Sequence, residues 1–112
     1  MDNCLFCKIA NKEINSEIVY ENEYVIAFKD INPIAKVHVL VIPKKHIENI
    51  NDLNTENSEY ALKCMFAIKE VAKIMNIHES GYRVVSNVGK DAKQEVFHLH
   101  FHVLGGEELS SH

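Results

Sequence analysis

Short apolar segments bounded by turn-forming residues predict five β-strands along this chain. The third segment is rich in β-branched side chains and stops at Pro43, which is typical of a buried strand. Asn22-Glu23 suits a tight turn between the first two strands, and residues 30–33 suit a loop. The predicted strands are residues 18–20, 24–29, 37–42, 82–86 and 97–104.

A long helix is predicted between the third and fourth strands. Thr55 and Ser58 both lie near its start and either could cap it, and it extends to about Ile77. Two adjacent apolar stripes make its apolar surface wide, which fits a helix sunk in the core of one chain and equally a helix that meets a partner subunit. One stripe is Ala61, Met65, Ile68, Ala72 and Met75, and the other is Cys64, Ala67, Val71 and Ile74.

A short helix over residues 4–11, where Leu5, Phe6 and Ile9 have helical spacing, completes the predicted elements. Two helices and five strands joined by short connections predict an α+β fold with a mainly antiparallel sheet. The 112 residues contain no repeat and no Pro/Gly/Ser linker, so we expect a single domain over residues 1–112.

Composition excludes several classes of protein. A net charge of -4 argues against non-specific binding to nucleic acid, which needs a basic surface. No apolar run approaches the length of a membrane span, so we expect no membrane partner. Three cysteines make a poor disulfide framework, and the N-terminus lacks the pattern of a secretory signal. Together these features predict a cytoplasmic protein.

Three histidines alternate with apolar residues near the C-terminus, at His98, His100 and His102. In a strand such residues share one face and lie on the order of 6.5–7 Å apart, while Leu99 and Phe101 point into the core. Near neutral pH, imidazole serves as nucleophile, proton carrier or metal ligand. A purification tag would not alternate with apolar residues, so the pattern predicts a functional site.

The segment 98–104, His-Leu-His-Phe-His-Val-Leu, resembles the signature of the histidine triad (HIT) family. The end of this segment with the following two glycines resembles the Hint-like branch of that family. The likeness implies a HIT-like fold and extends over nearly the whole chain. It includes residues 30–33, residues 38–46, and Arg83, Asn87, Gly89 and Gln94.

The resemblance implies a nucleotide hydrolase or transferase that acts at the α-phosphate. His100 would attack phosphorus and form a nucleotidyl-histidine intermediate that water cleaves, which divides one hard displacement into two easier ones. His102 would donate to the phosphoryl oxygens and to the leaving group. His38 would support the triad.

The resemblance also assigns nucleotide-binding residues, each with a structural alternative. Asn87 and Gln94 would contact the phosphate, or they tie the loop between them. Asp30 would accept from the ribose hydroxyls, or it forms the turn before Pro33. The residues implied for the base are apolar and would otherwise be core: Leu5, Phe6, Ile9, Phe28 and Ile31.

Cys4 and Cys7 form a Cys-x-x-Cys pair, which some HIT proteins combine with two histidines, here His46 and His98. Two thiolates and two imidazoles suit a closed, structural zinc site. Zinc would fasten the N-terminal helix to the catalytic strand, and the phosphoryl chemistry would not need it. The alternative is two reduced cysteines that pack as small apolar residues.

Two residues depart from the family pattern. Lys93 stands where the family usually has glycine, so either it adopts an unfavourable backbone conformation or it adds a cation beside the phosphate. Glu95 stands where many Hint proteins have Ser or Thr, and an ionised carboxylate cannot donate a hydrogen bond. Glu95 either points away or changes the leaving-group preference.

The leading hypothesis is therefore a homodimeric phosphoramidase that converts adenosine 5′-phosphoramidates to AMP and an amine. Its partners would be AMP-like or GMP-like purine nucleotides, and the purine preference is implied by the resemblance. The alternatives are a dinucleoside polyphosphate hydrolase, a non-catalytic nucleotide-binding protein, and a zinc-stabilised interaction module.

Overall fold

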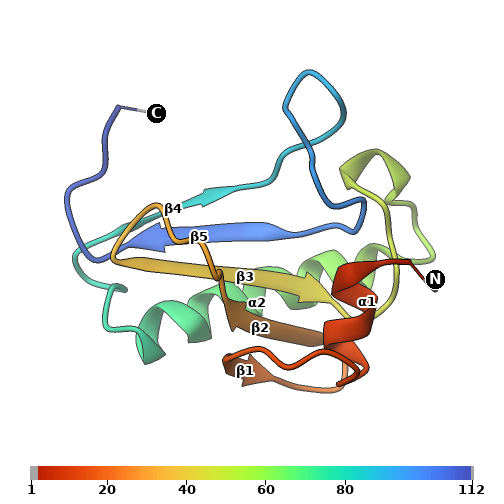
Figure 1. The fold of residues 1–112 in the computed structure, drawn as a ribbon, viewed down its shortest axis with the longest axis horizontal. Helices are drawn as coiled ribbons and strands as arrows, with labels where there is room; N and C mark the ends of the chain where they lie inside the picture. Colours follow the sequence, from red (N-terminus) through yellow and green to blue (C-terminus); the bar gives the residue numbers. More distant parts are fainter. Residues whose placement is uncertain (1–2, 112) are drawn as a thin grey trace.

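An antiparallel β-sheet lies at the centre of this computed structural model, which describes residues 3–111 (Figure 1). The strands are β1 (Ile18–Glu21), β2 (Val25–Lys29), β3 (Val37–Pro43), β4 (Tyr82–Val85) and β5 (Phe101–Gly105). Within residues 3–111 they pair in the order β1-β2-β3-β5-β4, each pair antiparallel. The helices are α1 (Leu5–Ala10), α2 (Ser58–Ile74) and the 3₁₀ turn η1 (Ile50–Asp52). This arrangement confirms the predicted α+β fold.

The two faces of the sheet are covered by different helices, and the strand period of two assigns each residue to one face. Helix α2 crosses the face behind the sheet in Figure 1, and α1 lies over the front of β2 and β3. On the α2 face the sheet contributes Val25, Ala27, Val39, Val41, Phe101 and Val103, and on the α1 face Ile26, Phe28, Leu40 and Ile42.

Helix α2 ends at Ile74, three residues before the predicted end at Ile77. Asn76 adopts a left-handed conformation with φ 59°, and its N–H donates to the carbonyl of Lys73. The N–H of Ile77 donates to the carbonyl of Ala72, which completes a Schellman motif. Ile77 is thereby turned back into the core as a buried residue outside the helix.

The two apolar stripes predicted on this helix are not buried equally. Cys64, Ala67, Ile68, Val71 and Ala72 pack in the core. Several large apolar side chains of α2 stay exposed, so part of its apolar surface faces outward. They are Leu62, Met65, Phe66 and Ile74.

Strand β5 begins at Phe101 and not at Phe97, so His98 and His100 precede the regular strand. Val41 opposite Phe101 is the last residue pair between β3 and β5. The pairing stops there because Pro43, two residues further along β3, has no N–H to donate. Beyond that point the N–H of Leu99 donates to the carbonyl of Ile47. The alternation of side chains continues nevertheless: Leu99 is in the core beside α2, and His98 and His100 contact Phe6 of α1.

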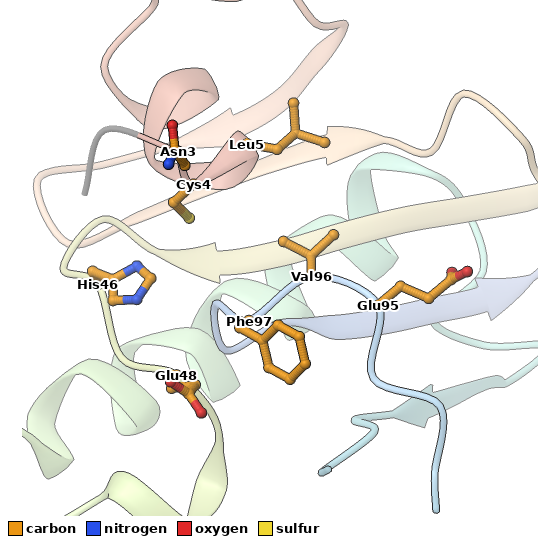
Figure 2. A pocket seen from close by; sticks show the side chains of 8 residues that line it. All are labelled: Asn3, Cys4, Leu5, His46, Glu48, Glu95, Val96 and Phe97. Atoms are coloured by element: carbon orange, nitrogen blue, oxygen red, sulfur yellow. The ribbon is translucent and has the colours of Figure 1, made fainter. Parts of the chain in front are cut away.

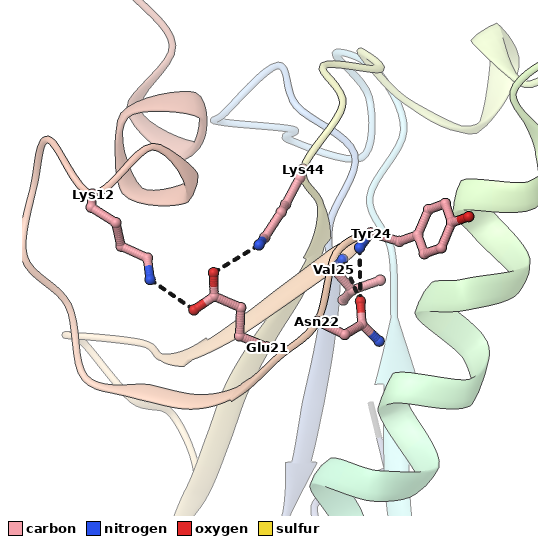
Figure 3. A network of polar contacts seen from close by, with 6 residues as sticks. All are labelled: Lys12, Glu21, Asn22, Tyr24, Val25 and Lys44. Carbon is pink, nitrogen blue, oxygen red and sulfur yellow. Dashed lines mark hydrogen bonds and ion pairs between the residues drawn. The ribbon is translucent and has the colours of Figure 1, made fainter.

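A polar network fastens the end of α1 to the sheet (Figure 3). The carboxylate of Glu21 accepts from Lys12 Nζ at 2.7 Å and from Lys44 Nζ at 2.7 Å. Lys12 follows α1 and Lys44 follows β3, so Glu21 joins the two elements. Asn22 closes the turn between β1 and β2, since its Oδ1 accepts from two backbone N–H groups of that turn.

Within residues 3–111, no helix is long and apolar enough to cross a membrane. Met1, Asp2 and His112 lie outside the described residues, and so does the part of the signal-sequence interpretation that rests on the first two. The single domain over residues 1–112 stays a prediction.

Candidate active site and metal cluster

His100 is held as a neutral imidazole with one free nitrogen. Its Nδ1–H donates to the backbone carbonyl of His98 at 2.7 Å, and a carbonyl oxygen can only accept. The proton is therefore on Nδ1, and Nε2 carries an available lone pair. Burial lowers the pKa of His100, although the bond to His98 and the charge of Asp30 act in the opposite direction. The hydroxyl of Ser86 donates to the carbonyl of His100 at 2.7 Å and fixes its backbone.

His38 and His102 are ordered in the complementary way. The N–H of Ile34 donates to His38 Nδ1 at 3.2 Å, so a neutral His38 carries its proton on Nε2. That nitrogen lies 2.9 Å from His102 Nδ1 and 3.4 Å from Asp30 Oδ2. His102 therefore accepts at Nδ1 and holds its own proton on Nε2. Of two neighbouring triad histidines, one offers a lone pair and the other a proton.

Burial keeps this pair uncharged. Burial, together with the smaller effects of the charges of His100 and His38, lowers the pKa of His102 to about 4, against the charge of Asp30, which raises it. Burial also lowers the pKa of His38, against the charge of Asp30, which raises it. Both rings are therefore neutral near pH 7, in agreement with the tautomers that their hydrogen bonds require.

His100 and His102 line a hollow of about 150 Å³, here called the histidine hollow. It continues into an apolar hollow of about 300 Å³, here called the base hollow, because Phe6, Asp30 and Leu40 line both. All the residues predicted to hold the base gather in the second hollow, namely Leu5, Phe6, Ile9, Phe28 and Ile31. The apolar walls can accommodate a flat ring, the carboxylate can accept from hydroxyl groups, and the two histidines can contact a phosphate.

Cys4, Cys7, His46 and His98 also meet, with their ligand atoms all within 4.8 Å of one another. His98 Nδ1 lies 3.3 Å from Cys4 Sγ and 3.5 Å from Cys7 Sγ, and His46 Nδ1 lies 3.3 Å from Cys7 Sγ. The Nε2–H of His98 donates to the carbonyl of Pro43 at 2.8 Å, so the lone pair on Nδ1 faces the thiols. The donor set and its orientation fit a tetrahedral zinc ion.

The four residues Cys4, Cys7, His46 and His98 are here called the metal cluster. The pKa shifts of His98 and Cys7 agree with a role as metal ligands. Burial lowers the pKa of His98 to about 4, which keeps its ring neutral as a ligand must be. Burial also raises the pKa of the Cys7 thiol to about 11, so the thiol loses its proton only when a cation replaces it. The backbone N–H of Cys7 donates to Cys4 Sγ, which makes Cys4 the N-cap of α1.

Asp30, His38 and His102 form a second group with ligand atoms within 4.8 Å of one another. A cation here would need the lone pair of His38 Nε2, the atom that carries the proton. Moving that proton to Nδ1 would set it against the N–H of Ile34. The group is therefore suited to proton transfer and unsuited to a metal ion.

Comparison with known proteins identifies the family of this chain and agrees with the geometry of the histidines. The family model described as HIT domain matches residues 11–109. The chain belongs to the HIT family. Its HIT segment contains His38, Asp30 and the three triad histidines, whereas Cys4 and Cys7 precede the matched range.

HIT relatives match the chain over nearly its full length. Protein HitA of Neisseria gonorrhoeae is 45% identical and is aligned over 94% of this chain and 97% of its own. The purine nucleoside phosphoramidase of Escherichia coli is 38% identical over 96% of this chain and 91% of its own. A HIT family hydrolase from Clostridium thermocellum has a TM-score of 0.95 at 49% identity, with 98% and 96% of the two chains covered.

The predicted phosphate ligands of this HIT chain occupy different positions. Asn87 lines the histidine hollow, while Gln94 is buried outside it. The Gln94 amide accepts from Asn49 Nδ2 and Gly89 N and donates to two backbone carbonyls. The structure thus gives Gln94 the loop-tying alternative, and a phosphate contact of Gln94 stays a prediction. Asp30 serves its turn by accepting from the N–H of Asn32 at 2.8 Å while it also lines the hollow.

Lys93 and Glu95, the two departures from the HIT pattern, both line the histidine hollow. Lys93 has φ 60°, so it holds the left-handed conformation that glycine adopts at little cost. Sequence reasoning missed Asn49 and Ser86, which hold Gln94 and the carbonyl of His100. The position of Ser86 directly after β4, next to the triad strand, is the one signal that could have identified it.

Proposed function

We propose that this HIT protein hydrolyses purine nucleoside 5′-phosphoramidates to a nucleoside monophosphate and an amine. The observation that carries the proposal is the complementary protonation of two adjacent histidines. The hydrogen bonds leave a lone pair on His100 Nε2 and a proton on His102 Nε2, and both rings line one hollow. The name of the Escherichia coli relative supports the choice of substrate.

In the proposed reaction, His100 Nε2 forms a bond to phosphorus and the bond from phosphorus to the amine nitrogen breaks. In the substrate complex the negative phosphoryl group lets the pair of His102 and His38 take up a proton from solvent. His102 then gives its Nε2 proton to the departing nitrogen, which leaves as a neutral amine, and the pair is neutral again. Water then cleaves the phosphorus–His100 bond and releases the monophosphate. Asn87 and Lys93 line the hollow and would donate to the phosphoryl oxygens.

The base hollow would hold the purine and Asp30 would accept from the ribose. The apolar walls contact any flat base, so the purine preference rests on the name of the Escherichia coli relative. Three free thiols at Cys4, Cys7 and Cys64 support a reducing compartment, and we place the protein in the cytoplasm on that basis.

We propose a structural role for zinc in the metal cluster. Cys4, Cys7, His46 and His98 would hold it, and it would join α1 to the segment that precedes β5. Zinc would keep His98 in place while its carbonyl accepts from His100. His100 and His102 would remain available for the phosphoryl chemistry.

We also propose that two copies pair through α2 and β4. Leu62, Met65 and Phe66 are exposed on α2, and Val84 is exposed on β4. Within residues 3–111, the outer edge of β4 pairs with no strand, and such an edge is a site for pairing with another chain. The mass of the wild type in solution should be that of a dimer, and Phe66→Glu should reduce it to that of a monomer. A wild type with the mass of a monomer would refute the pairing.

The proposed function is tested by turnover of adenosine 5′-monophosphoramidate and diadenosine tetraphosphate. We expect faster cleavage of the phosphoramidate, abolished in His100→Ala and retained in His78→Ala, since His78 is a half-exposed histidine outside the site. Faster cleavage of the tetraphosphate would favour a dinucleoside polyphosphate hydrolase. Nucleotide binding without turnover of either substrate would show a binding protein.

A further inference from the structure

A third hollow, of about 580 Å³, adjoins the histidine hollow. Glu95 and Val96 line both, so the space beside His100 and His102 continues into it. Figure 2 shows its walls, with the segment of His46 and Glu48 facing the segment of residues 95–97, and the start of α1 across their ends. Its volume lies within the range of roughly 300–1,000 Å³ that is typical of ligand sites.

The charged residues of this wall are both acidic, Glu48 and Glu95, and both are exposed. Among the ion pairs of residues 3–111, neither glutamate takes part. Two thiolates balance a divalent ion, so zinc in the neighbouring metal cluster would leave this surplus of negative charge unchanged. An occupant with a positive charge would therefore be favoured, and a polyphosphate would be repelled.

The rest of the wall is largely apolar and accessible. Phe97 is 53% exposed and Leu5 is 44% exposed, and Val96 lines both this hollow and the histidine hollow. Exposed apolar side chains beside free carboxylates suit a ligand with an apolar body and a cationic end.

We propose that this third hollow, here named the leaving-group hollow, binds the amine that leaves the phosphorus and selects amines carrying a second, positively charged group on an apolar chain. The proposal rests on the proposed function and specifies its substrate class. The nucleoside occupies the base hollow and the phosphorus lies at His100. The amine nitrogen is protonated through His102, and the chain attached to that nitrogen extends into the adjoining hollow. Glu95, which lines both hollows, is the residue that determines this specificity.

The experiment uses three adenosine 5′-phosphoramidates with leaving groups of the same length. They derive from 1,5-diaminopentane, pentylamine and 5-aminopentanoate, which end in a cation, a methyl group and an anion. For the wild type we expect kcat/KM to fall in that order, by about fivefold at each step, the effect of one or two exposed charge pairs. The differences should shrink when salt is raised, because exposed charges are screened.

The double variant Glu48→Gln/Glu95→Gln should bring the three values of kcat/KM to within about twofold of one another. The control Glu79→Gln, which removes an exposed carboxylate outside the hollow, should leave the order unchanged. Equal values in the wild type, or an order that persists in the double variant, would overturn the leaving-group hollow alone, since the pentylamine compound would still be cleaved. If none of the three compounds is cleaved, the proposed function and the leaving-group hollow are both refuted.

Discussion

Two groups of histidines lie side by side in this protein, and the positions of their protons separate them. In the metal cluster, His98 commits its Nε2 proton to Pro43 and turns a lone pair toward Cys4 and Cys7. In the pair of His38 and His102, a proton lies between the two rings. Both groups have ligand atoms within 4.8 Å of one another, so distance does not distinguish them. The hydrogen bond on the outer nitrogen of each ring decides between a metal ligand and a proton carrier.

The largest effect that would sharpen this comparison is expected for His102→Ala. Loss of the proton donor should lower turnover of an alkylamine phosphoramidate by roughly 10²–10⁴-fold. A p-nitrophenyl ester of AMP, whose leaving group needs no proton, should lose far less. Equal losses on the two substrates would contradict the role of His102 as proton donor, and the zinc content should stay at one ion per chain in either case.

Cys7→Ser should affect zinc binding, which His102→Ala should leave intact. For the wild type with zinc at about 100 to 1,000 times its dissociation constant, a chelator should lower the free energy of unfolding by about 3–4 kcal/mol. Cys7→Ser should lack this response. Cys64→Ala is the matched control, because Cys64 is buried on α2, outside the metal cluster, and should leave the response intact. A chelator response in Cys7→Ser equal to that of the wild type would remove Cys7 from the zinc site.

A smaller effect is expected for His38→Ala, which tests the link between the two rings. The proton of His38 Nε2 orients His102, so its removal should lower kcat/KM by roughly 10–100-fold, the size typical of residues that position a ligand or catalytic group. Zinc content and the chelator response should not change. A loss of zinc in this variant would show that the pair of His38 and His102 is itself the metal site.

The smallest effect is expected for Glu21→Gln, which loosens the C-terminal end of α1 from the sheet. Hydrogen bonds from Lys12 and Lys44 lower the pKa of Glu21 below its ordinary 4.5. Its contribution is therefore present above about pH 4.5 and is lost as the pH falls through the lowered value. At pH 7 the variant should lose less than about 1 kcal/mol of unfolding free energy, as is usual for exposed pairs.

Urea unfolding at pH 7 and pH 3 measures that difference, with Glu56→Gln as an exposed control. A difference between Glu21→Gln and the wild type that grows toward low pH would contradict the assigned ion pairs.

Local sequence pattern predicted the parts of this fold that depend on alternation. Val39 and Val41 face α2 while Leu40 and Ile42 face α1, as expected of a strand buried on both faces. The same alternation keeps the histidines together even where β5 is not a regular strand. The base residues were implied by the family resemblance, and the structure brings them together in one hollow from α1, β2 and the loop after β2.

Contacts between distant segments decided what the pattern could not predict. The late start of β5 depends on Pro43 in the neighbouring strand and on the carbonyl of Ile47. The hydrogen bonds of Gln94 are completed by Asn49 and the carbonyl of Glu48, which no local pattern connects to it. Proton positions in the histidines follow from such long-range partners, so the sequence could name His98 and His102 and could not assign their tautomers.

The zinc content of His98→Asn and His100→Asn tests the separation of the two groups most directly. The account predicts no bound zinc in His98→Asn and one zinc per chain in His100→Asn. Loss of zinc from both variants, or its retention in both, would contradict the account, in which His98 belongs to the metal cluster while His100 and His102 take part in catalysis.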